Sequence, residues 1–354
     1  MSKLFQALTL GDLHLKNRIV MAPMTRNRAS AEGVPDALMA EYYGQRGDAG
    51  LIVAEGTWPS ATGQAYCRQP GIATPAQIKG WQEVTDAVHA KGGLIVLQIM
   101  HGGRIGSHHI KATGTETVAP SALLAAGQVV TDSAGMQPYD MPRALETQEV
   151  KAIVQEHAQA ARNARLAGFD GVELHCTSGY LPMQFLCSGT NLRTDEYGGS
   201  ATQRARFAIE CLSEMGQAIG SGRVGLRVNP GNTFNDTSDE NSAKTHIELM
   251  QQAAKLNLAY LHVMRAPVPE IDAFEMAQMH FGDRLILNDG FTPENSEEAL
   301  TQYANSALSY ARHFIGNPDL VQRLQHGYPL TRFDRKTLYT PGAAGYTSYT
   351  SHTP

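Results

Sequence analysis

The chain has 354 residues, of which 18% are charged, and its formal net charge at neutral pH is −5. This charge argues against nucleic acid or an acidic membrane as partner. Four cysteines without CxxC spacing, and the lack of any apolar run near the roughly 20 residues that a bilayer span needs, predict a cytoplasmic protein with reduced thiols.

Short apolar runs alternate with segments of helical periodicity along the chain. The first feature is Leu8–Leu15, where alternating apolar residues flank Gly11-Asp12 and predict a β-hairpin. Eight later apolar runs predict strands at Arg18–Met24, Gly50–Glu55, Leu94–Met100, Gly171–Leu174, Val224–Val228, Ala259–Val263, Arg284–Leu287 and Ala307–Phe314. Helical spacing predicts helices at Pro75–Lys91, Thr147–Leu166, Ala201–Ile219, Ser242–Leu256, Pro293–Tyr303 and Pro318–Leu324, the last with Asn317 as N-cap.

Strands that alternate with helices eight times are typical of an α/β fold, the closed parallel (β/α)8 TIM barrel. We predict one such domain over residues 1–354, because no linker interrupts the pattern as two domains would require. The hairpin is expected to plug the barrel end opposite the site. Residues 102–145 are too many for a barrel loop and predict a capping insertion after the third strand. The tail Gly342–Pro354 either folds over the mouth or frays.

Polar or glycine residues follow the ends of most predicted strands, and a barrel gathers such ends around one mouth. The most specific segment is His175–Leu181, in which Ser178 follows His175 by three residues and Tyr180 follows two later. If the chain turns helically there, His175 and Ser178 share a face, and the three side chains form an oxyanion-binding and proton-donating set. A histidine after a strand is more often structural, so this segment alone leaves both readings open.

Several further motifs occur in a characteristic order, namely Met21–Arg26, Glu55–Thr57, Gln98–Arg104, Ser188–Ser200, Gly225–Val228, Asn317–Leu320 and Gly345–Tyr349. Together with His175–Leu181 they resemble the old yellow enzyme family, the FMN-dependent ene reductases, in its bacterial N-ethylmaleimide and pentaerythritol tetranitrate reductase-like branch. The resemblance covers essentially the whole chain. It implies a non-covalent FMN, reduced by NAD(P)H, that passes a hydride from flavin N5 to the activated C=C bond of an α,β-unsaturated carbonyl or nitro compound.

The resemblance also assigns residues to the cofactor. The Thr25 hydroxyl would lie near flavin O4, Gln98 would bind the pyrimidine side, and Arg227 would lie beside N1 and O2. Backbone atoms would line the ring at Pro23, Met24, Thr25, Arg26 and Gly56. The phosphate would bind at Gly290, Ala311 and Arg312; the alternative for Arg312 is an ion pair with an acidic neighbour such as Asp319.

For the substrate, the resemblance implies that His175 and Ser178 bind the carbonyl or nitro oxygen while Tyr180 protonates the α carbon. Tyr66 would line the pocket, or else be an exposed loop residue. Three departures stand out. Ser178 replaces the usual Asn or His, Met100 in the pocket wall replaces a tryptophan, and Ala311 replaces a glycine.

Two other functions stay open. The shorter Ser178 and the wider pocket at Met100 fit a flavin reductase of nitrate esters or nitroaromatics. A flavin-free barrel lyase or hydrolase, or a barrel kept as a binding module, is the other alternative. No Gly-x-Gly-x-x-Gly follows a strand, so nicotinamide would bind transiently over the flavin. No metal site is predicted, and the protein is expected to be a monomer or homodimer acting on small molecules.

Overall fold

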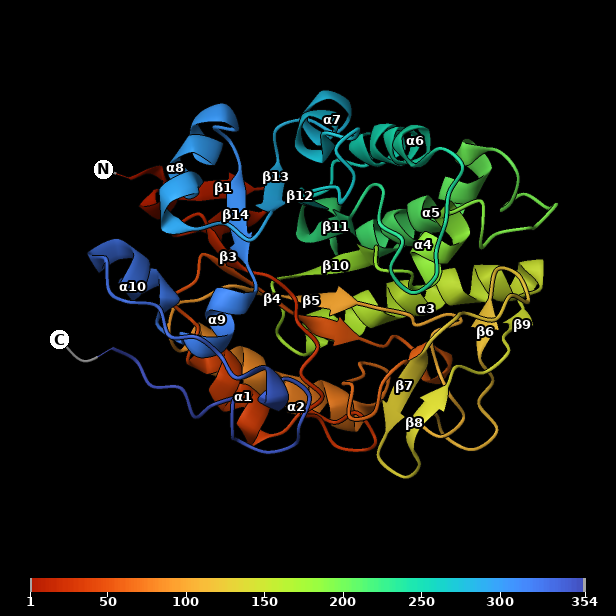
Figure 1. The fold of residues 1–354 in the computed structure, drawn as a ribbon, viewed down its shortest axis with the longest axis horizontal. Helices are drawn as coiled ribbons and strands as arrows, with labels where there is room; N and C mark the ends of the chain where they lie inside the picture. The colour runs from red at the N-terminus through yellow and green to blue at the C-terminus, as the bar shows by residue number, and fades with distance from the viewer. Residues whose placement is uncertain (1, 353–354) are drawn as a thin grey trace.

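The structure is a computed structural model that describes residues 2–352. Eight parallel strands close into a barrel, and the last of them pairs with the first (Figure 1). In order around the barrel the strands are β3 (Ile19–Met21), β4 (Leu51–Thr57), β5 (Ile95–Ile99), β10 (Gly171–Cys176), β11 (Val224–Val228), β12 (Tyr260–Met264), β13 (Leu285–Asn288) and β14 (Ala307–Tyr310). The predicted TIM barrel is confirmed.

Helices pack around the barrel. Those with a clear apolar stripe were predicted from the helical spacing of their apolar residues. The longer helices are α1 (Ala37–Gly44), α2 (Pro75–His89), α3 (Thr147–Leu166), α5 (Ala201–Ile219), α6 (Ser242–Ala254), α7 (Ala273–His280) and α8 (Pro293–Gln302). Capping boxes start α2 at Thr74 and α5 at Ser200, which explains why their first residues were predicted correctly. The shorter elements are α4 (Leu181–Leu186), α9 (Arg312–Gly316), α10 (Leu320–His326), η1 (Lys3–Phe5), η2 (Ala61–Gly63), η3 (Ser221–Arg223) and η4 (Arg335–Thr337).

Two boundaries near the C-terminus differ from the prediction. The strand expected to reach Phe314 ends at Tyr310, because the apolar run continues into the buried face of α9. The last helix starts at Leu320 with Asp319 in the N-cap position. Asn317, expected as that cap, instead donates from its amide to the carbonyls of His313 and Thr331, at 2.8 and 3.1 Å, and so joins the loop to α9.

The N-terminal hairpin closes one end of the barrel. Strands β1 (Leu8–Leu10) and β2 (Leu13–Leu15) pair antiparallel, and their leucines pack into one apolar cluster with residues of β3, β4 and β5. Gly11 has φ +58°, and a Cβ there would lie 2.4 Å from the Gly222 carbonyl oxygen. Gly222 precedes β11, so the hairpin lies at the amino ends of the strands, as predicted.

The insertion after β5 contains two small sheets. Strand β6 (Val118–Ala119) pairs with β9 (Arg143–Ala144), and β7 (Gln128–Thr131) forms an antiparallel hairpin with β8 (Gly135–Pro138). Figure 1 shows that hairpin projecting from the barrel on the side away from α8. The insertion therefore contains regular secondary structure. The length of residues 102–145 predicts an insertion but gives no indication of these strands.

The C-terminal segment is anchored to the barrel. Tyr346 is fully buried and stacks on Tyr42 with ring centroids 3.9 Å apart, and the Arg26 guanidinium donates to the Gly345 carbonyl at 2.7 Å. Of the two readings of this tail, fraying is wrong for its described part; residues 353–354 lie outside the described range. Between residues 2 and 352 no helix is both long and apolar enough to cross a bilayer. All four cysteines are buried and free.

Candidate active site

A cavity of about 770 Å³ opens at the carboxyl ends of the barrel strands. This volume lies within the range of small-molecule sites. Eleven of the residues predicted for the site line it, namely Pro23, Thr25, Tyr66, Gln98, Met100, His175, Ser178, Tyr180, Arg227, Ala311 and Arg312. They come from segments almost 290 residues apart in the chain, and the barrel brings them together as the strand-end argument requires.

Four predicted cofactor residues do not line this cavity: Met24, Arg26, Gly56 and Gly290. The Arg26 side chain is fully buried against the C-terminal segment, and its backbone N–H donates to Glu55 Oε2 at 3.1 Å. Gly56 lies behind the wall, where a Cβ would come 2.5 Å from the Met100 sulfur. Gly290 is exposed with φ +59° and has open space around it. Direct flavin contacts from these four stay predictions.

The turn after β10 is not the helical turn that the spacing predicted. Ser178 has φ +57° and Gly179 has φ +74°, so both adopt left-handed conformations. The Asn235 amide stabilises the turn by donating to the Ser178 carbonyl at 2.9 Å. A non-glycine residue with positive φ is uncommon, and such residues cluster at functional sites. Although the path differs, His175, Ser178 and Tyr180 still line the same cavity, as predicted.

His175 is a neutral imidazole. Burial and the nearby Arg227 guanidinium lower its pKa to about 3. Its Nδ1 atom is buried and has no hydrogen-bond partner within residues 2–352. An unpartnered polar atom of a residue lining a cavity needs an explanation, and a bound ligand is one. The geometry therefore fits a site that binds a polar group.

Arg227 lies beside His175 in the floor of the cavity, because the two are register partners on adjacent strands β10 and β11. Its Nη2 donates to Asn288 Oδ1 at 3.0 Å, and its Nη1 contacts the ring of His262. Arg227 is 5% exposed, and burial lowers its pKa from the usual value; a guanidinium nevertheless stays protonated in proteins. The site thus holds a fixed cation next to His175.

A buried carboxylate supports this cation from below. Glu173 Oε2 lies 2.8 Å from His262 Nδ1, and its Oε1 accepts from the Gln98 amide at 2.8 Å. Glu173 is fully buried; desolvation raises its pKa, but the charges and hydrogen bonds of its neighbours, His262 above all, outweigh this and leave the pKa below the usual value. It therefore orients both Gln98 and, through His262, Arg227. Glu173 was not predicted as a site residue, although it precedes His175 by two residues and so shares its face of β10.

Two tyrosines meet above this floor. The hydroxyls of Tyr66 and Tyr180 are 2.8 Å apart, and their rings are perpendicular with centroids 6.4 Å apart. Burial raises the pKa of Tyr180 well above its usual value and that of Tyr66 to about 12, so both phenols stay protonated at neutral pH. Tyr66 is thus part of the cavity wall and not an exposed loop residue.

Arg312 is exposed at the start of α9, on the cavity wall. The alternative that it pairs with Asp319 is wrong, because Asp319 Oδ1 accepts from Arg323 Nε at 2.7 Å. No carboxylate among residues 2–352 forms an ion pair with Arg312. Its guanidinium is available for an anion such as a phosphate.

Other parts of the lining were not predicted. The insertion contributes Gln128, Val129, Val130, Met136 and Tyr139, and later segments contribute Phe234, Asn235, Met264, Asn288 and Tyr339. Of these, Met264 and Asn288 carried a signal, since each directly follows an apolar run that predicts a strand. The rest lie in the β7–β8 hairpin or in irregular segments, whose position over the barrel depends on long-range contacts.

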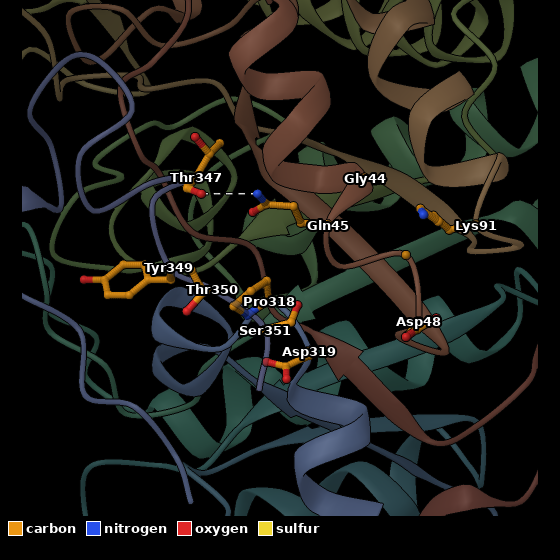
Figure 2. A pocket seen from close by; sticks show the side chains of 11 residues that line it. Gly44, Gln45, Asp48, Lys91, Pro318, Asp319, Thr347, Tyr349, Thr350 and Ser351 are labelled. Carbon is orange, nitrogen blue, oxygen red and sulfur yellow. Dashed lines mark hydrogen bonds between the residues drawn. The ribbon is translucent and has the colours of Figure 1, made fainter. Parts of the chain in front are cut away.

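A second hollow of about 590 Å³ lies outside the barrel, between the end of α1 and the C-terminal segment (Figure 2). Figure 2 shows Gln45 donating to the Thr347 carbonyl across it, at 3.2 Å. Asp319, also in its wall, is engaged by Arg323. Gln45 and Asp319 are thus engaged in holding the C-terminal segment, so this hollow does not resemble a catalytic site.

The residues around the 770 Å³ cavity fit a flavin mononucleotide. The buried cation Arg227, the Gln98 amide and the Thr25 hydroxyl suit the polar edge of a flat heteroaromatic ring, and Arg312 suits a phosphate. No group of three or more His, Cys, Asp or Glu side chains in the described range could hold a metal ion.

Comparisons with known proteins agree with this chemistry. The family model described as "NADH:flavin oxidoreductase / NADH oxidase family" matches residues 3–331. A probable flavin mononucleotide-dependent alkene reductase of Leishmania infantum is 40% identical over 352 residues, 98% of this chain and 96% of that one. Morphinone reductase, solved with tetrahydroNAD, is 40% identical with TM-score 0.94 over 99% of this chain and 98% of its own. An old yellow enzyme homologue from Zymomonas mobilis is 37% identical with TM-score 0.94, covering 98% and 99%.

Proposed function

Since this chain belongs to the NADH:flavin oxidoreductase / NADH oxidase family, we propose that its cavity binds FMN and works as the active site of an NAD(P)H-dependent ene reductase. It is an enzyme of old yellow enzyme type, and the flavin-free lyase, hydrolase or binding-module alternative is wrong. Bound FMN supplies the hydride that adds to the β carbon of an activated alkene.

The floor of the cavity holds the cofactor. Arg227 is held by Asn288 and by His262, which in turn contacts Glu173. Its charge is therefore already in place to stabilise an anionic pyrimidine edge. Gln98 is oriented by Glu173 to bind the same edge, and Thr25 also lines the cavity. Arg312 binds the phosphate, with Gly290 and Ala311 beside it.

The upper wall of the cavity binds and protonates the substrate. The neutral His175 and the Ser178 hydroxyl bind the carbonyl or nitro oxygen, which polarises the conjugated C=C bond. Tyr180 donates its hydroxyl proton to the α carbon, because its ring lies 5.0 Å from that of His175 and its phenol stays protonated. Tyr66 and Met100 border the substrate.

One observation carries this proposal most directly: Arg227 and His175 are register partners on adjacent strands, so one ring system can contact both. The test is spectroscopic. The full-length protein purified with FMN should show a flavin spectrum that NADPH or NADH bleaches without oxygen and that 2-cyclohexenone restores. A protein that binds no FMN, or whose bleached spectrum the enone leaves unchanged, would refute the proposal.

Nitrate esters or nitroaromatics are the second candidate acceptors. Ser178 is favourable for this reading because its short side chain, in a left-handed backbone conformation, places only a hydroxyl beside the bound oxygen. Steady-state rates with cyclohexenone and with a nitrate ester separate the two acceptor classes. A strong preference for the enone would exclude the nitro reading.

We also propose that residues 1–354 form a single domain, a monomer or homodimer in the cytoplasm, whose partners are small molecules. Four buried free thiols support a reducing compartment. The morphinone reductase complex with tetrahydroNAD supports NAD(P)H as the reductant bound in the same cavity.

A further inference from the structure

The proton that Tyr180 gives to the substrate has to be replaced in every catalytic cycle. Tyr180 is 7% exposed, and within residues 2–352 the Tyr66 hydroxyl is the only hydrogen-bond partner of its own hydroxyl, at 2.8 Å. Burial raises the pKa of Tyr180 well above its usual value, so a lone tyrosinate there is strongly disfavoured. Loss of the Tyr180 proton is therefore favourable only if a second proton arrives as it leaves.

Tyr66 is placed to supply that proton. Its side chain is only partly buried, so it connects the deep phenol of Tyr180 with the open part of the cavity. The loop that carries it is held rigidly: Gln69 is fully buried, accepts from the backbone N–H of Tyr66 at 3.2 Å and donates to the Gly56 carbonyl at 2.9 Å. The contact between the two phenols thus belongs to the fixed wall and needs no rearrangement.

We propose that Tyr66 is a proton-relay residue that positions and reprotonates Tyr180 during alkene reduction. This inference rests on the proposed function. The Tyr180 O–H bond breaks as its proton forms a C–H bond at the α carbon, while the Tyr66 O–H bond breaks and its proton moves to the Tyr180 oxygen. Water in the open part of the cavity then gives a proton to Tyr66. One solvent proton is consumed per alkene, together with the hydride.

The test compares Tyr66→Phe with Tyr328→Phe, a matched control. Tyr328 is partly buried like Tyr66, but it packs near the rings of His326 and His352 and does not line the cavity. The measurement is the rate at which NADPH-reduced holoenzyme is reoxidised by cyclohexenone in mixtures of H₂O and D₂O, and by ferricyanide, which needs no proton on carbon. Loss of a hydrogen bond to a group that develops charge predicts that Tyr66→Phe slows the enone reaction by about 10- to 100-fold. Reoxidation of Tyr66→Phe by ferricyanide, and both reactions of Tyr328→Phe, should stay near wild type.

The proton inventory reports the relay itself. If two protons move in the same step, the wild-type rate depends on the deuterium fraction of the solvent along a curve. In Tyr66→Phe only one proton moves, so this dependence should become linear. The double variant with Tyr180→Phe should be no slower than Tyr180→Phe alone, because Tyr66 acts through Tyr180. A linear wild-type inventory, an unchanged Tyr66→Phe rate, or additive losses would each overturn the relay while leaving the ene reductase function intact. Failure of the wild-type holoenzyme to react with the enone would instead refute the function itself.

Discussion

The rings of His175 and Tyr180 lie 5.0 Å apart between centroids, inclined by 39°, on the two sides of a left-handed turn. His175 is the penultimate residue of strand β10, whereas Tyr180 precedes α4, so the turn between them sets the separation of the oxygen-binding group and the proton donor. Ser178 occupies the first left-handed position of this turn. The identity of residue 178 therefore affects both the backbone and the oxygen site.

We predict that Ser178→Asn speeds the oxidation of reduced enzyme by cyclohexenone. Asparagine tolerates the left-handed conformation better than serine and adds an amide donor toward the substrate oxygen. One hydrogen bond to a group that gains charge corresponds to ~1.5–3 kcal/mol, or roughly a 10- to 150-fold rate gain. Stopped-flow reoxidation measures it, and thermal unfolding should show no loss of stability. A rate equal to or below that of wild type would contradict the prediction, and Ser178→Ala gives the reference without any donor.

Arg312 and Arg323 form a matched pair for testing the phosphate site. Arg312→Gln should raise the Kd for FMN by about 10-fold or more, because a charge-assisted hydrogen bond to phosphate is lost. The unfolding free energy of the flavin-free protein should change by less than about 0.5 kcal/mol, since the Arg312 side chain is exposed.

Arg323→Gln should do the reverse. Arg323 is 5% exposed and donates to Asp319 and to the carbonyls of Pro329 and Thr350, so its loss leaves buried acceptors unpaired. A stability loss of roughly 1–3 kcal/mol is expected, with little change in the Kd for FMN. Titration of flavin fluorescence and urea unfolding separate the two effects. If Arg312→Gln bound FMN as tightly as wild type, the phosphate assignment would fail.

The barrel could be predicted from the sequence because its elements have local signals. The limits of α3 and α5 follow from apolar periodicity and, in α5, from a Ser200 capping box. Helix α1 was missed because it is apolar around much of its circumference, with Tyr42 and Tyr43 adjacent and both buried, so that it carries no amphipathic stripe.

Site residues could be predicted only where polar side chains follow or end the barrel strands. His175 and Arg227 come together because they are register partners on adjacent strands, and in the sequence both lie at the carboxyl ends of consecutive apolar runs. The direction of the Arg26 side chain depends on Tyr42 and on the C-terminal segment, more than 300 residues away, and no local pattern reveals such partners. The same holds for the insertion, whose Tyr139 reaches the cavity through an irregular path.

The mouth of the cavity predicts a preference for bulky apolar substrates. Val130, Met136 and Phe234 line it although they are 55%, 53% and 59% exposed. Half-burial of one such side chain by a substrate is worth about 1 kcal/mol, or roughly fivefold in affinity. Phe234→Ala should therefore raise KM for a polycyclic enone about fivefold while leaving KM for cyclohexenone unchanged. Leu166→Ala, an exposed leucine that does not line the cavity, is the control. Equal changes in KM for the polycyclic enone and for cyclohexenone would show that the mouth of the cavity does not discriminate between substrates by size.

Buried histidines predict that stability falls in mild acid. Burial lowers the pKa of His175 to about 3 and those of His157 and His262 to about 4, and it lowers that of His101 well below its usual value. The unfolded chain binds protons at these sites below pH ~6.5, whereas the folded protein does not, so each one destabilises the fold as pH falls. From pH 6.5 to 5 this amounts to about 2 kcal/mol per histidine. Glu55 acts in the opposite direction, because burial raises its pKa to about 7 and the folded state gains a proton there first.

The histidines outnumber this carboxylate, so the unfolding free energy of the FMN-saturated protein should be lower at pH 5 than at pH 7.5. His157→Gln isolates one contribution, since His157 lies in α3 and does not line the cavity. In this variant the loss between the two pH values should be smaller than in wild type by about 2 kcal/mol, whatever its stability at pH 7.5. Urea unfolding at both pH values measures the difference. An identical pH dependence in the variant and the wild type would show that His157 titrates normally in the folded protein.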